Sequence, residues 1–76
     1  RMETLYFTWE KGPAVLDPVG DADFGYFISP GNDDWTVATP GQVADFFVDG
    51  EKMSKTSFEN KFGVIGKDLP VLPEVT

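Results

Sequence analysis

The 76-residue sequence contains no cysteine and no histidine. Without cysteine it has no disulfide bond and no thiolate ligand for a metal ion. Without histidine it lacks the side chain that most often serves as a general base or as a metal ligand. We therefore expect a non-catalytic protein with no cofactor and no metal site.

Basic residues are scarce: 6 Lys and Arg stand against 13 Asp and Glu, for a net charge of −7. No basic residue occurs between Lys11 and Lys52, and most of the remaining basic residues gather between Lys52 and Lys67. The acidic body should repel nucleic acids and anionic membranes and attract basic partners.

Long apolar runs are also absent, since no segment approaches the roughly 20 apolar residues of a membrane span. No signal peptide is visible, because the residue after Met2 is Glu3 and not the start of an apolar run. The expected location is intracellular or within a particle.

Apolar side chains are nevertheless plentiful, with 41% hydrophobic and 14% aromatic residues. This composition is too apolar for a disordered chain and supports one modest core. We predict a single small α+β domain over residues 1–66 and an extended, Pro-containing tail over residues 67–76. The predicted fold is a small antiparallel sheet of about three strands packed with two short helices.

Three strands are predicted, over residues 4–9, 25–29 and 35–38. In the first, alternation places Leu5, Phe7 and Trp9 on one face. The Gly and Pro residues of segment 10–25 predict a long loop. The turn cluster at 30–34 predicts that the second and third strands form a hairpin.

A first helix is predicted to start at Thr39, which with Gln42 forms a capping box, and to end before Gly50. Asp45 and Asp49 fall together on one face of this helix. The apolar residues of another face are Val43, Ala44, Phe47 and Val48.

A second helix is predicted to start at Thr56, with Glu59 completing its capping box, and to end at Gly63. Phe58 and Phe62 form an apolar i, i+4 pair on it. Both helices are about two turns long, so packing must hold them. The polar connection between the two helices predicts a helix–loop–helix arrangement.

Residues 51–56, EKMSKT, resemble the lysine-rich KMSKS loop of class I aminoacyl-tRNA synthetases. In that family the second lysine, here Lys55, would neutralise the phosphates of ATP in the transition state. The HIGH signature of that family requires histidine, which this chain lacks, and its nucleotide fold is longer than 76 residues. We interpret the segment as a polar connection between helices.

The stretch WTVATPGQVADFF, followed after a loop by SKTSFENKFG, is similar to the helix-turn-helix of MerR-like and excisionase-like DNA-binding proteins. The resemblance implies that the second helix enters the major groove. Its contacts would be Lys55, Thr56, Ser57, Asn60 and Lys61. The loop is longer than the tight turn of that family, and the acidic body lacks phosphate-binding charge. Nucleic-acid binding through the region from Lys52 to Lys67 is therefore the alternative function.

The tail places Leu69, Val71 and Leu72 between prolines. Such a pre-extended segment can lie in a groove or add to a sheet edge of another chain, or fold back on its own domain. These three residues and Trp35 are the predicted partner contacts. The favoured function is a non-catalytic interaction or structural subunit that docks on a larger protein assembly or forms a homo-oligomer. It would be an accessory, virion-type or inhibitor-type small acidic protein.

Overall fold

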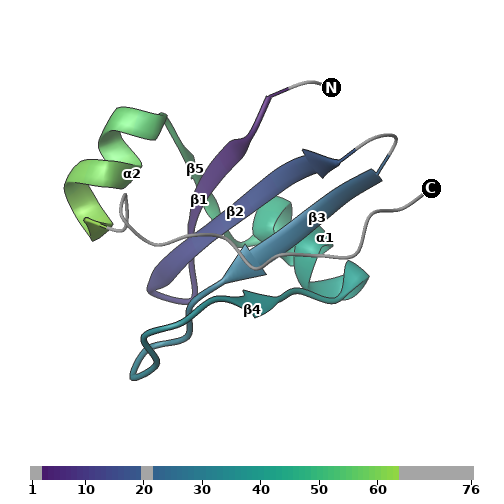
Figure 1. Ribbon diagram of the computed structural model, residues 1–76, viewed down its shortest axis with the longest axis horizontal. Helices are drawn as coiled ribbons and strands as arrows, with labels where there is room; N and C mark the ends of the chain where they lie inside the picture. Colours follow the sequence, from purple (N-terminus) through teal and green to yellow (C-terminus); the bar gives the residue numbers. More distant parts are fainter. Residues whose placement is uncertain (1–2, 20–21, 64–76) are drawn as a thin grey trace.

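A computed structural model describes residues 3–19 and 22–63. They form one antiparallel sheet with a helix packed on each face, so the predicted α+β class is confirmed (Figure 1). The sheet has five strands in the order β4-β3-β2-β1-β5, so the prediction of about three strands is wrong. The elements are β1 (Leu5–Trp9), β2 (Gly12–Val19), β3 (Ala22–Phe27), β4 (Thr36–Val37), α1 (Pro40–Val48), β5 (Glu51–Met53) and α2 (Lys55–Phe62).

Segment 10–25, predicted to be a loop, instead contains β2 and the start of β3. The β1–β2 hairpin turns through Glu10 and Lys11, whose φ angles are 52° and 65°. Two consecutive positive φ values define the tight two-residue turn whose twist matches that of the flanking strands. This turn normally favours Asn and Gly, so Glu-Lys gave no turn signal in the sequence.

Two prolines in β2 also concealed the strand. Residues of a central strand bond alternately to its two neighbours. Pro18 lies two positions past Leu16, the last β2 residue paired with β1, so its missing N–H faces no described strand. Pro13 lies at the other end, where its carbonyl accepts a hydrogen bond from Ile28 N–H (3.1 Å) just beyond β3. Neither proline therefore breaks a ladder in its middle.

The predicted start of α1 is confirmed. Thr39 Oγ1 accepts from Gln42 N–H (3.2 Å), and Gln42 Oε1 accepts from Thr39 N–H (2.9 Å). Pro40 is the first helical residue, where a missing donor breaks no hydrogen bond. The helix ends at the C-cap Asp49, directly before Gly50.

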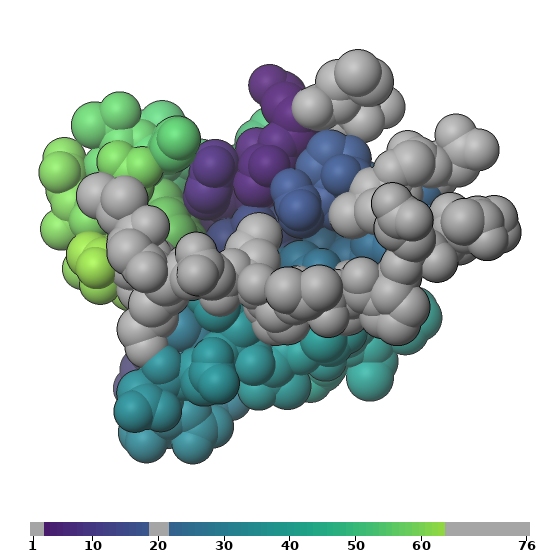
Figure 2. Space-filling view, in the orientation of Figure 1, coloured from purple at the N-terminus to yellow at the C-terminus, as the bar shows by residue number. Residues whose placement is uncertain are grey.

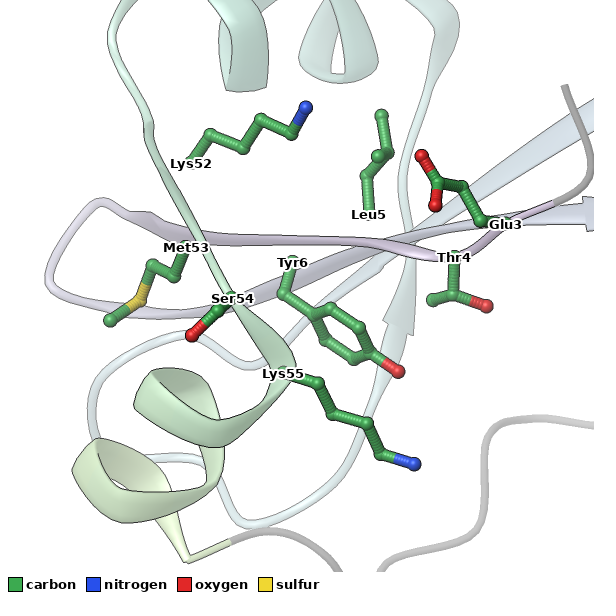
Figure 3. Close-up of a pocket in the computed structure, with 8 residues that line it drawn as sticks. All are labelled: Glu3, Thr4, Leu5, Tyr6, Lys52, Met53, Ser54 and Lys55. Atoms are coloured by element: carbon green, nitrogen blue, oxygen red, sulfur yellow. The ribbon is translucent and has the colours of Figure 1, made fainter.

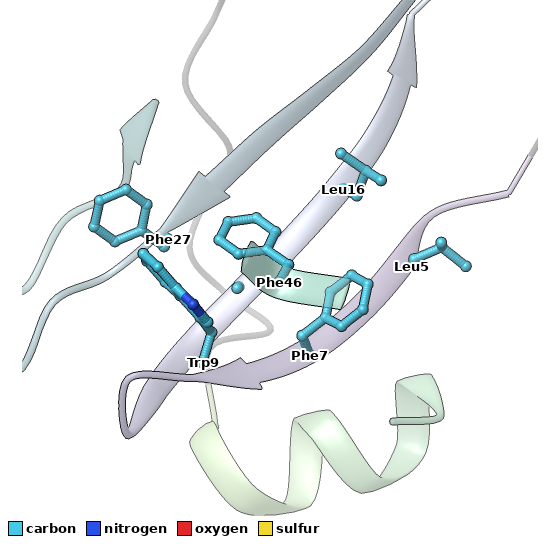
Figure 4. Packing of buried hydrophobic residues seen from close by; sticks show 7 residues of the cluster. Leu5, Phe7, Trp9, Leu16, Phe27 and Phe46 are labelled. Carbon is cyan, nitrogen blue, oxygen red and sulfur yellow. The ribbon is translucent and has the colours of Figure 1, made fainter. Parts of the chain in front are cut away.

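The buried face of α1 differs from the predicted one. Phe46 is fully buried, whereas Phe47 and Val48 are 55% and 78% exposed. The Phe46 ring lies 4.9 Å from that of Trp9 and 5.8 Å from that of Phe7, centroid to centroid. Figure 4 shows it among the rings and leucines of the sheet. The buried residues of this cluster are Leu5, Phe7, Trp9, Ala14, Leu16, Phe27 and Phe46.

The connection between the helices contains β5, which pairs with β1 as an edge strand. Because β5 ends at Met53, α2 starts earlier than predicted. Its N-cap is Ser54, whose Oγ accepts from Ser57 N–H (3.1 Å), and not Thr56. The predicted end is confirmed, since Gly63 is a left-handed C-cap with φ 60°.

The two helices lie on opposite faces of the sheet. Phe7 points toward α1 and contacts Phe46, whereas its neighbour Tyr6 contacts Phe58 of α2 at a centroid distance of 5.1 Å. Adjacent residues of a strand point to opposite faces, so the predicted helix–loop–helix is wrong. α2 stands beside β1 in the space-filling view (Figure 2). The buried residues on its side are Val15, Tyr26, Ile28, Trp35 and Phe58.

None of the helices in the described part of the chain is long and apolar enough to cross a membrane. The predicted tail, with Leu69, Val71 and Leu72, lies outside the described residues.

Candidate interaction surface

The outward side of α1 presents apolar side chains to solvent. Ala44, Phe47 and Val48 are all exposed and follow the i, i+3, i+4 spacing that places residues on one helical face. We call these three residues the outer face of α1. Large apolar side chains exposed at adjacent positions are the kind of feature that a binding partner covers.

The position of Phe46 explains why this face is exposed. Gly25 of β3 lets α1 approach closely, since a Cβ atom there would lie 3.1 Å from Phe46 Cε2. With Phe46 directed into the sheet, Phe47 is turned by about 100° around the helix axis. Its ring reaches only the rim of the core, where it meets Phe7 edge-on at a centroid distance of 5.2 Å.

Carboxylates flank the outer face. Asp45 of α1 and the C-cap Asp49 lie one turn apart, as the sequence predicted, and Glu10 of the β1–β2 turn is near enough to repel the charge of Asp49. Asp45 is held in place by Trp9, whose Nε1–H donates to Asp45 Oδ2 at 2.8 Å. We call Glu10, Asp45 and Asp49 the acidic flank.

The acidic flank is electrostatically unfavourable by itself. The pKa of Asp49 is raised first because its protonated carboxyl can donate a hydrogen bond to the Asp45 carboxylate, and then by the negative charge of Asp45; Glu10 adds to the repulsion. Asp49 also caps the C-terminal end of α1, the negative end of the helix dipole. The last turn of α1 contains no basic residue.

A separate feature of the surface lies along the edge formed by β1 and β5. It is a shallow groove of about 410 Å³, shown in Figure 3. The residues of the KMSK stretch, Lys52 to Lys55, line one side of it. In that view the side chains of Lys52 and Lys55 extend on opposite sides of β1, so the two ammonium groups do not converge on one ligand position. The groove therefore offers no paired-lysine site for a phosphate.

The residues predicted to contact nucleic acid lie together on α2. All five are exposed: Lys55, Thr56, Ser57, Asn60 and Lys61. Lys55 lies 4.0 Å from Glu59 Oε1, and Lys61 lies 5.6 Å from the centroid of the Phe62 ring. However, α2 is not supported by α1 as in a helix-turn-helix, because the sheet lies between them.

Trp35, predicted as a partner contact, is 9% exposed and belongs to the cluster on the α2 side of the sheet. Among the described residues, no group of three or more Asp, Glu, His or Cys is placed to hold a metal ion. The sequence did not predict the outer face of α1, because helical spacing groups Phe47 and Val48 with Val43 on one apolar face, and an apolar face is expected to pack on the core.

No protein family, curated protein or solved structure matches this chain.

Proposed function

We propose that this chain is a non-catalytic interaction protein that docks on another protein through the outer face of α1. The observation that carries the proposal is the exposure of Phe47 and Val48, at 55% and 78%, at adjacent positions of a well-capped helix. Burying one such side chain contributes about 1.5–3 kcal/mol, so two can anchor a small interface.

A capture experiment with matched variants tests this proposal. The parent chain is immobilised and exposed to lysate of the source organism, beside Val48→Ser and Val37→Ser. Val37 is also an exposed valine, at 45%, but it lies on the edge strand β4, before the start of α1, and is not part of the outer face. We expect the same protein to be captured by the parent and by Val37→Ser, and at least about tenfold less by Val48→Ser, since a central apolar anchor typically contributes more than about 1 kcal/mol.

Size-exclusion chromatography of the purified chain shows whether the partner is a second copy. A shift to a dimer that Val48→Ser abolishes would identify self-association. A lone monomer at high concentration that captures nothing would refute the proposal, as would equal capture by all three chains.

DNA binding through α2 is a second candidate, supported by the exposure of all five predicted contacts. Duplex binding at low salt would be compared for the parent, Lys55→Ala and Lys61→Ala. Replacing a lysine that contacts a phosphate should reduce the slope of log affinity against log salt concentration by about one. Absence of binding at low salt would remove this candidate.

A further inference from the structure

We infer that the partner docked on the outer face of α1 is a basic protein segment, rich in lysine or arginine with apolar residues between them. This inference rests on the proposed function and specifies the chemistry of the partner. The outer face supplies the apolar contact, and the acidic flank determines the charge of whatever covers it.

The first step is the placement of the charges. Asp45 lies three residues before Val48 on α1, and Asp49 follows Val48 directly. Asp49 is the C-cap residue, and Trp9 holds the carboxylate of Asp45 at 2.8 Å. A partner that covers Val48 must therefore pass within reach of both carboxylates.

The second step is the repulsion among these carboxylates. Asp45 and Glu10 both repel the charge of Asp49, and the last turn of α1 has no basic residue. Covering the helix with an apolar or acidic partner would remove water from these carboxylates and increase the repulsion. A basic partner would instead be attracted to these carboxylates. The net charge of −7 would also speed its association with the chain.

The third step concerns the shape of the basic side chain. Lysine and arginine cover apolar surface with their methylene stems while their charged ends reach outward. Such a stem can lie on Val48 while its charged end meets Asp49. A free metal ion would gain the charge but would leave Phe47 and Val48 exposed, so a protein segment satisfies both parts of the surface.

Two fluorescent model peptides of equal length test the inference, one an amphipathic Leu/Lys helix and the other the corresponding Leu/Glu helix. Fluorescence anisotropy at low and at physiological salt would compare the parent with Asp49→Asn, Glu10→Gln, Val48→Ser and Glu59→Gln. Glu59 lies on α2, across the sheet, so Glu59→Gln removes the same charge from the other side.

We expect the Leu/Lys peptide to bind at least about tenfold more tightly than the Leu/Glu peptide at low salt. Asp49→Asn and Glu10→Gln should each weaken that binding about two- to fivefold, since an exposed ion pair contributes up to about 1 kcal/mol. Glu59→Gln should leave it unchanged, and Val48→Ser should weaken it as well.

Equal binding of the two peptides would overturn the inference. So would equal effects of Asp49→Asn and Glu59→Gln, because net charge alone would then explain the binding. If Val48→Ser keeps full affinity for the Leu/Lys peptide, the outer face is not where a basic segment binds and the inference fails, whereas the proposed function is decided by capture from lysate. If Val48→Ser still abolishes capture from lysate while the peptides bind equally, docking stands and only the charge of the partner is wrong.

Discussion

The indole N–H of Trp9 donates a hydrogen bond of 2.8 Å to the carboxylate of Asp45, 36 residues later in the chain. It joins the end of β1 to the middle of α1. The same contact fixes one carboxylate of the acidic flank, so the core and the proposed interaction surface share a residue pair.

Replacing Trp9 with Phe should lower the free energy of unfolding by about 1–3 kcal/mol, because a hydrogen bond to a charged group and part of the ring packing are lost. Asp45→Asn keeps an acceptor oxygen and should have a smaller effect. Urea denaturation measures both. Equal losses for the two variants would show that the charge of Asp45, and not its role as acceptor, determines the contribution.

Adjacent phenylalanines on α1 should differ sharply in their importance for stability. Phe46→Ala should lower the free energy of unfolding by about 3–5 kcal/mol, since the ring is fully buried. Phe47→Ala should cost about 1 kcal/mol, because mainly its edge contact with Phe7 is lost. Thermal and urea unfolding provide the comparison, and similar losses at both positions would contradict the assignment of the buried face.

Gly25→Ala should destabilise the fold by about 1–3 kcal/mol, because the added Cβ would lie 2.6 Å from Val43 Cγ2. Removing that methyl group with Val43→Ala should relieve the clash. The double variant should therefore lose less stability than the sum of the two single variants. Additive losses would mean that close approach of α1 to β3 does not restrict this position.

The stability contributed by Asp49 should depend on pH. Its pKa in the folded state is raised above 3.8, first by the hydrogen bond with Asp45 and then by the charge of Asp45. The folded chain therefore binds this proton more tightly than the unfolded chain, and the repulsion is relieved as pH falls through the raised pKa. Asp49→Asn should unfold at a higher temperature than the parent at pH 7, and the difference should shrink as the pH approaches 3.8. Melting curves across this range measure it, and a pH-independent difference would contradict the assignment.

Local signals in the sequence were sufficient for several elements. The capping box of Thr39 and Gln42 is made by residues three positions apart, so it forms whenever the helix does. Gly63 ends α2 because a left-handed residue is needed there. Alternation likewise placed Leu5, Phe7 and Trp9 on one buried face of β1.

Other elements depend on pairing between strands that are distant in the sequence, which no local sequence pattern predicts. β2 was hidden by Pro13 and Pro18, which are tolerated only because of where the neighbouring strands end. β5 has three residues and becomes a strand by pairing with β1. That pairing also makes Ser54, and not Thr56, the cap of α2.

The sequence by itself determined the chemical character of this protein: a small acidic chain without thiol or imidazole, with an aromatic core and two capped helices. Only the tertiary structure decided which side of α1 is buried. Helical spacing permits more than one apolar face, and the close approach of Gly25 and the ring of Trp9 direct Phe46 inward. Phe47 and Val48 are thereby left exposed beside the acidic flank, because a helix on a sheet can bury only one of its sides.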